Sequence, residues 1–247
     1  MVLGVVTAVA IFGVASAWGH YIERASDEEF EVSGEDLSRT PPVSQELVES
    51  WQRPKGPLRV GLQVGHWKNS EAPDELHRLR ERGGGTAGGG KAEWQVNLAI
   101  AQETAKLLEA KGIVVDLLPV TIPPDYLADL FISIHADGST NSGVSGFKVA
   151  SPWRDATGRG EELVDIFEKA YGNTTGLEID LNVTRNMRGY YAFNWRRYEH
   201  SIHEMTPAII LETGFLTSRV DQKVLIRNPA LAARGIAQGV FEFLGVE

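Results

Sequence analysis

Leu130-Phe131-Ile132-Ser133-Ile134-His135-Ala136-Asp137 is the stretch of sequence that decides the fold. Its first five residues form a largely apolar run, which is typical of a parallel strand buried on both faces. A histidine and an aspartate follow at once, so polar side chains stand where the strand ends. Two other runs share this design: residues 58–64 precede Gly65-His66, and residues 208–211 precede Glu212-Thr213-Gly214.

Strands and helices alternate through the rest of the folded part. Apolar residues at three- and four-residue intervals predict a helix over residues 93–111, which ends at Lys111-Gly112. The remaining predicted strands cover residues 113–118 and 146–150, and the remaining predicted helices cover residues 161–171 and 230–244. Such alternation predicts an α/β fold, a mostly parallel sheet with helices on both faces, in a single catalytic domain.

The 247 residues divide into three predicted parts. Residues 1–22 contain an uncharged apolar run, and three interpretations stay open: a membrane anchor or uncleaved signal, a signal cleaved after Ala15-Ser16-Ala17, or a buried helix. The first two place the remainder outside the cytoplasm, secreted or membrane-anchored in the cell envelope. Residues 23–57 are acidic and contain prolines, which predicts a linker with a short helix at residues 44–51. Residues 58–247 form the predicted catalytic domain.

Composition excludes several classes of function. The net charge is −9, which argues against nucleic acid as the main partner because phosphate neutralisation requires a basic surface. The chain has no cysteine, so disulfides, thiolate zinc sites, iron–sulfur clusters and cysteine nucleophiles are all excluded. Any metal must therefore be bound by His, Asp or Glu.

The polar residues at the strand ends point to a metal site. Ligands of open parallel sheets bind beyond the carboxyl ends of the strands, so His66, His135 and Glu212 should meet at one edge. Glu93 begins the long predicted helix and can face the same edge. Two imidazoles and one carboxylate suit a catalytic zinc ion with a position left open for water. Glu212 would then be a carboxylate that moves protons. The pattern alone leaves open that these histidines are structural.

Four segments carry a resemblance to a known family. They are, in chain order, Val64-Gly65-His66, Glu93-x-x-x-Asn97-Leu98-Ala99-x-Ala101, Ser133-Ile134-His135-Ala136-Asp137, and Pro207-Ala208-Ile209-Ile210-Leu211-Glu212-Thr213-Gly214-Phe215-Leu216-Thr217-Ser218. Over about residues 58–244 the chain resembles the zinc-dependent N-acetylmuramoyl-L-alanine amidases of the amidase 3 type. The resemblance implies one zinc ion on His66, Glu93 and His135, with Glu212 as the catalytic carboxylate. It implies peptidoglycan as the substrate, cleaved between muramic acid and L-alanine, and leaves open whether a partner activates the enzyme.

The sequence departs from this family in two places. Gln63-Val64-Gly65-His66-Trp67-Lys68 keeps the histidine but lacks the usual Asp and the small residues that follow. Residues 120–126 lack the arginines that usually lie before the second histidine. Two alternatives therefore stay open: a zinc hydrolase of another amide or peptide, and a catalytically weakened protein that binds the cell wall.

Three other features compete for a function. Residues 85–91 resemble a phosphate-binding loop, but Ala92 stands where Ser or Thr should bind magnesium, so we expect a mobile loop beside the cleft. His200 and His203 are the main rival metal ligands. Residues 186–198 are rich in aromatic and arginine side chains, which fits either a wall of the substrate site or packing against the sheet.

Overall fold

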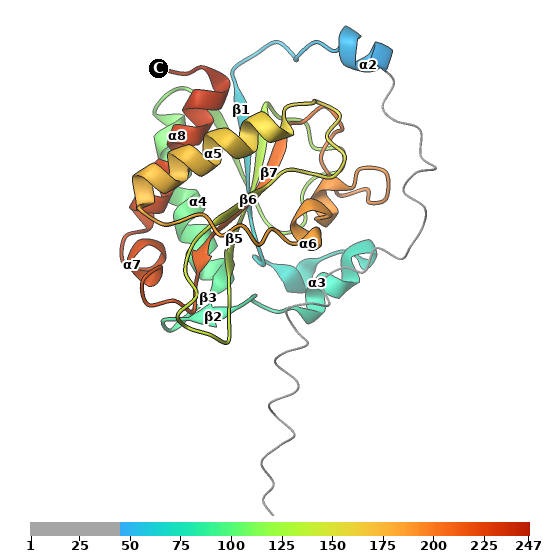
Figure 1. The fold of residues 1–247 in the computed structure, drawn as a ribbon. Coiled ribbons are helices and arrows are strands. Elements are labelled where there is room, and N and C mark those ends of the chain that lie inside the picture. The colour runs from blue at the N-terminus through green and yellow to red at the C-terminus, as the bar shows by residue number, and fades with distance from the viewer. Residues whose placement is uncertain (1–44) are drawn as a thin grey trace, which may run out of the picture.

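The computed structural model describes residues 45–247 (Figure 1). The predicted N-terminal segment, residues 1–22, and the linker as far as residue 44 lie outside the described residues. In the described part, no helix is long and apolar enough to cross a bilayer. A short helix, α2 (Gln45–Ser50), lies where one was predicted.

A five-stranded sheet forms the centre of the molecule, in the order β4-β1-β5-β7-β6. Four strands are parallel: β4 (Val114–Leu118), β1 (Arg59–Val64), β5 (Leu130–Asp137) and β7 (Ala208–Phe215). The short edge strand β6 (Lys148–Ala150) pairs antiparallel with β7. The predicted mostly parallel sheet is therefore confirmed, with β5 in the middle.

Three long helices cover one face of the sheet. They are α4 (Glu93–Glu109), α5 (Gly160–Thr175) and α8 (Pro229–Leu244), which pack against one another and against the strands. Alternate strand residues such as Val60, Leu62 and Ile132 join them in one buried cluster. Each of the three helices overlaps its predicted range.

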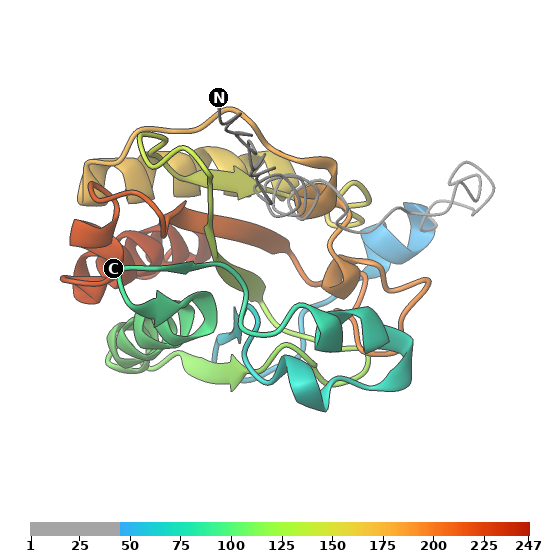
Figure 2. The same cartoon turned by 90° about the horizontal axis from the view of Figure 1, so that it is seen from below.

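Short segments cover the opposite face. They are η1 (Asn69–Glu71), η2 (Asp74–Leu76), α3 (His77–Glu81), α6 (Arg185–Arg188) and η3 (Tyr191–Phe193). Figure 2 shows α4 and α8 on one side of the strands, with α3 and α6 on the other. Phe131 and Ile210, which alternate with the residues of the first face, pack into this second cluster with Leu79 and Met187. Much of the predicted aromatic segment is therefore packed against the sheet.

Two further elements complete the fold. The glycine-rich stretch forms a small hairpin of β2 (Ala87–Gly88) and β3 (Lys91–Ala92), where a mobile loop was expected. A short helix, α7 (Gln222–Leu225), follows β7. At the end of the predicted linker, Arg53 forms an ion pair with Asp129.

The strand order decides where the polar strand ends meet. Because β5 lies between β1 and β7, His135 lies between His66, which follows the end of β1, and Glu212, which lies in the second half of β7. His135 and Glu212 are partners in the β5–β7 register. Because side chains alternate along a strand, both residues belong to the second face. Within residues 45–247, only short segments cover this face, so no long helix fills the space beside His135 and Glu212.

Candidate metal centre

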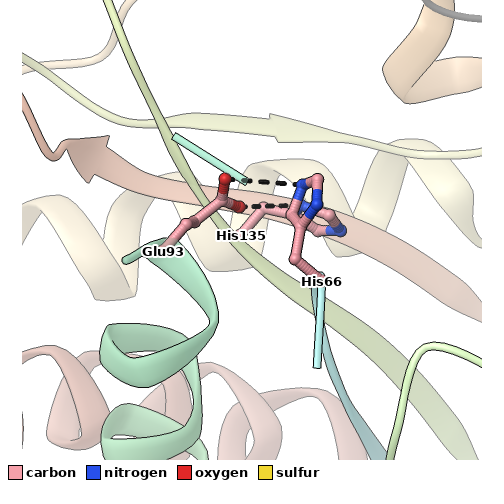
Figure 3. Close-up of side chains that lie close together, drawn as sticks. All are labelled: His66, Glu93 and His135. Carbon is pink, nitrogen blue, oxygen red and sulfur yellow. Dashed lines mark hydrogen bonds and ion pairs between the residues drawn. The ribbon is translucent and has the colours of Figure 1, made fainter. Parts of the chain in front are cut away.

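His66, Glu93 and His135 converge on one point (Figure 3). Each offers one ligand atom, and these atoms all lie within 4.8 Å of one another. Glu93 stands between the two imidazoles: its Oε1 lies 3.1 Å from Nδ1 of His135, and its Oε2 lies 3.4 Å from Nε2 of His66. The three side chains come from the end of β1, the first residue of α4 and the end of β5.

Strained backbone places His66. Its φ is 62°, in the left-handed region that a residue with a side chain rarely adopts. Asn69 Nδ2 donates to the carbonyl oxygen of Gly83 at 2.8 Å and lies 3.2 Å from Nδ1 of His66. The imidazole is thus fixed on the side away from Glu93.

The Glu93 carboxylate is buried and surrounded by donors. The backbone N–H groups of Thr86 and Ala136 donate to it at 3.0 and 3.2 Å. Asn97, one helical turn later, donates to Glu93 Oε1 at 3.2 Å and to the carbonyl oxygen of Gly65 at 3.4 Å. The spacing Glu93-x-x-x-Asn97 therefore has a physical reason, since Asn97 links the carboxylate to the backbone that precedes His66.

The protonation states suit metal ligands. Burial, the largest influence, lowers the pKa of His66 to about 4 against the opposing charge of Glu93, and His135 and Arg82 lower it further. Burial acts to raise the pKa of Glu93, but His66, His135 and the N–H of Thr86 outweigh it and hold that pKa at about 2. At neutral pH, His66 therefore has a lone pair to donate and Glu93 carries its negative charge.

The donor set fits zinc. Ligand bonds of about 2.1 Å in a tetrahedral site put neighbouring ligand atoms about 3.4 Å apart. The two nitrogen–oxygen distances around Glu93, one to each carboxylate oxygen, are close to that value, and one donor atom from each residue lies within 4.8 Å of the others. Two imidazoles and one carboxylate also leave a fourth position open, as in catalytic zinc sites.

A cleft opens beside this cluster. It has a volume of about 50 Å³, room for roughly three to five water molecules. His66, His135 and Glu212 line it together with Asn69, Leu79, Arg82, Val120, Asn186, Met187, Tyr190 and Ile210. The four predicted site residues thus lie close together: three form the cluster, and Glu212, the register partner of His135, lines the cleft with His66 and His135. A space of this size can enclose only a small part of a large substrate, the rest of which would lie on the surrounding surface.

Lys148 is a residue that the sequence analysis missed. It lies opposite Glu212 in the β6–β7 register, and its side chain is buried. It forms ion pairs with Asp137 and, at 3.3 Å, with Asp180. Burial lowers the pKa of Lys148, but the hydrogen bond and charge of Asp137, with the charges of Asp180 and Glu212, outweigh it and raise that pKa. A fixed positive charge therefore faces the predicted catalytic carboxylate. The proximity of Lys148 to Glu212 comes from the pairing of β6 with β7, and no local sequence motif encodes that pairing.

The unusual residues around the first histidine lie outside the cluster. Gln63 points to the second face, where it donates to the carbonyl oxygen of Val120 at 2.8 Å and accepts from Ser133 Oγ at 2.6 Å. Trp67 packs against the core cluster of the first face and does not line the cleft. In this first departure from the family pattern, Gln63 thus serves a buried hydrogen-bond network and Trp67 serves packing.

The rival histidines are engaged elsewhere. His200 pairs with Glu75 at 2.6 Å, and His203 Nδ1 accepts the backbone N–H of Met205 at 3.0 Å. Among the described residues, His66, Glu93 and His135 form the one group of three side chains suited to a metal ion.

Gly85→Ala should disrupt the cluster. An alanine Cβ there would lie 2.8 Å from the His66 ring and closer still to Glu93 Oε2, at a φ of +77°. Gly90→Ala is a matched control, because Gly90 has the same φ but no atom within 4 Å of an added Cβ. We expect Gly90→Ala to cost about 1–2 kcal/mol of stability from backbone strain alone. Gly85→Ala should cost more and weaken zinc binding at least about tenfold, as changes around metal ligands do. Zinc titration and thermal unfolding of both variants test this; equal zinc affinity would contradict it.

The chain is similar to a family of known proteins and to several solved structures. The profile of the Amidase_3 family, described as N-acetylmuramoyl-L-alanine amidase, matches residues 60–242. The catalytic domain of the amidase CwlV from Bacillus (Paenibacillus) polymyxa var. colistinus is similar in structure, with a TM-score of 0.53 and 22% identity over 77% of this chain and 99% of that one. The amidase AmiC2 of Nostoc punctiforme has a TM-score of 0.52 and 23% identity over 78% and 99% of the two chains.

A third similar structure is the CwlD amidase from Clostridioides difficile, in complex with the GerS lipoprotein. It has a TM-score of 0.54 and 16% identity over 77% of this chain and 100% of that one. These structural likenesses concern the fold. No curated protein matches the chain.

Proposed function

The chain belongs to the Amidase_3 family of N-acetylmuramoyl-L-alanine amidases, and from this membership we propose that it cleaves the amide between N-acetylmuramic acid and L-alanine in peptidoglycan, with one zinc ion on His66, Glu93 and His135. The observation that carries the proposal is the cleft in which two of these ligands and Glu212 face the same small space.

Each residue of the site has a role in this proposal. A zinc ion bound there would polarise the scissile carbonyl and lower the pKa of a water molecule to near 7. Glu212 accepts a proton from the attacking water and donates it to the nitrogen of L-alanine as the amide breaks. Lys148, opposite Glu212, favours the ionised carboxylate that must accept this proton. Asn69 and Asn97 are positioning residues for His66 and Glu93.

The domain arrangement belongs to the same proposal. Peptidoglycan lies outside the cytoplasmic membrane, so the apolar residues 1–22 would export the chain or anchor it. Residues 23–57 would then form the linker to the catalytic domain, residues 58–247.

Product analysis tests the reaction directly. The full chain is incubated with purified peptidoglycan and zinc, and the released products are identified by mass spectrometry. We expect free stem peptides that begin with L-alanine and glycan that retains intact muramic acid. Products in which the bond between muramic acid and alanine survives would instead indicate hydrolysis of another amide or peptide bond. Binding to the wall without any product would indicate a wall-binding protein.

A further inference from the structure

Exposed apolar side chains gather on one strip of the surface. The described residues expose six large apolar side chains, and four of them lie on two neighbouring segments: Trp153, Ile179, Leu181 and Val183. Backbone hydrogen bonds hold these segments side by side, from Asp180 N–H to the Phe147 carbonyl at 2.8 Å and from Trp153 N–H to the Arg188 carbonyl at 3.0 Å. We call these four residues the apolar strip. Exposed apolar side chains that gather on neighbouring segments mark a binding site more often than singly scattered ones do.

Trp153 has contacts that orient its ring. Its side chain is 54% exposed, yet its Nε1–H donates to the carbonyl oxygen of Arg185 at 3.4 Å. The guanidinium of Arg188 lies 4.3 Å from the centre of its ring. A large aromatic ring that is already fixed loses little conformational entropy when a ligand stacks on it.

Helix α6 joins the apolar strip to the cleft. Arg185 and Arg188 contact Trp153, while Asn186 and Met187, between them in the chain, line the cleft. A substrate that extends from the cleft over α6 would therefore meet Trp153. The cleft volume of about 50 Å³ requires most of the substrate to lie outside it.

We propose that Trp153, backed by Arg188 and continued by the apolar strip, binds the glycan strand of peptidoglycan at sugar units beyond the muramic acid whose amide is cleaved. This inference rests on the proposed function, because that function defines the substrate that extends from the cleft over α6. Beyond Trp153 and Arg188 the strip consists of apolar side chains, which offer no partner for the carboxylates of a stem peptide. Sugar rings present an apolar face of C–H groups to an aromatic ring, and their hydroxyl and acetamido oxygens accept hydrogen bonds from guanidinium groups. A protein partner, such as the lipoprotein bound in the CwlD structure, is the rival occupant.

Binding of peptide-free glycan strands tests the subsite without any turnover. Calorimetric titration compares the full chain with Trp153→Ala, Trp153→Phe and Leu107→Ala. Leu107 is the matched control, since it is an exposed apolar residue near the end of α4, far from Glu93 at its start. We expect Trp153→Ala to weaken binding about tenfold, Trp153→Phe to restore most of it, and Leu107→Ala to leave it unchanged.

Kinetics with two substrate lengths separate this inference from the proposed function. Trp153→Ala should raise KM on glycan of several disaccharides that carries stem peptides, with kcat and the KM for a single-disaccharide muropeptide unchanged. Glycan binding that is absent from the wild-type chain, or unaffected by Trp153→Ala, would overturn the subsite and favour a protein partner. Failure of the wild-type chain to cleave either substrate would instead overturn the proposed function, while Trp153-dependent binding of peptide-free glycan would still stand.

Discussion

Glu212→Gln should keep its zinc and lose turnover by about 10²–10⁴-fold, the usual contribution of one proton-transferring group. Glutamine preserves the shape of the side chain at the β5–β7 pairing but cannot accept the proton of the attacking water. The expected signature is a loss in kcat on peptidoglycan with unchanged zinc content and unchanged unfolding temperature.

Glu242→Gln provides the control for this variant, because Glu242 is an exposed glutamate on α8. It should remain fully active. Full activity in Glu212→Gln would remove Glu212 from the catalytic step, whereas loss of zinc would mean that it holds the metal.

His135→Ala should abolish both zinc binding and activity. In the proposed zinc site the imidazole supplies one of three protein donors, and its loss would leave Glu93 and His66 as the remaining pair. Changes in residues that only support metal ligands already weaken binding by about 10–100-fold, so removal of a donor should cost more than about 100-fold. Metal analysis after dialysis, together with a zinc titration, measures this directly.

The matched variant for His135→Ala is His200→Ala. His200 also pairs with a glutamate but lies outside the cluster, so its removal should leave the zinc content unchanged. If zinc instead stays with His135→Ala and leaves with His200→Ala, the metal site lies at the rival histidines.

The sheet and the converging site residues could be predicted because their signals are local and strong. An apolar run that ends in a histidine or glutamate defines both a buried strand and its functional end, as at His135 and Glu212. Convergence of the strand ends at one edge of the sheet follows from the parallel direction of the strands. The strand order, which places β5 between β1 and β7, comes from the structure.

The second face could not be predicted in the same way. Helices as short as α3 and α6 are unstable alone and form only because Leu79 and Met187 pack against the sheet. Lys148 was missed for a related reason. Its ion-pair partners, Asp137 and Asp180, lie 11 and 32 residues away in the chain, so no local sequence pattern links them to it. The glycine-rich stretch was expected to be mobile because glycine favours loops, but close packing of Gly85 against two candidate ligands requires glycine there.

The short strand β6 also bears on how the protein avoids self-association. It lies at the edge of the described sheet, where unpaired backbone groups could recruit a strand from another copy. The segment of residues 178–188 bonds to the backbone on either side of β6, at Phe147 and Trp153, and so leaves little of this edge open. β6 offers only three residues, and the inward-pointing charge of Lys148 stands at its first position. Short edge strands with inward charges are a common protection against edge-to-edge aggregation. The lysine that faces the site would thus also help to keep this parallel sheet soluble during folding.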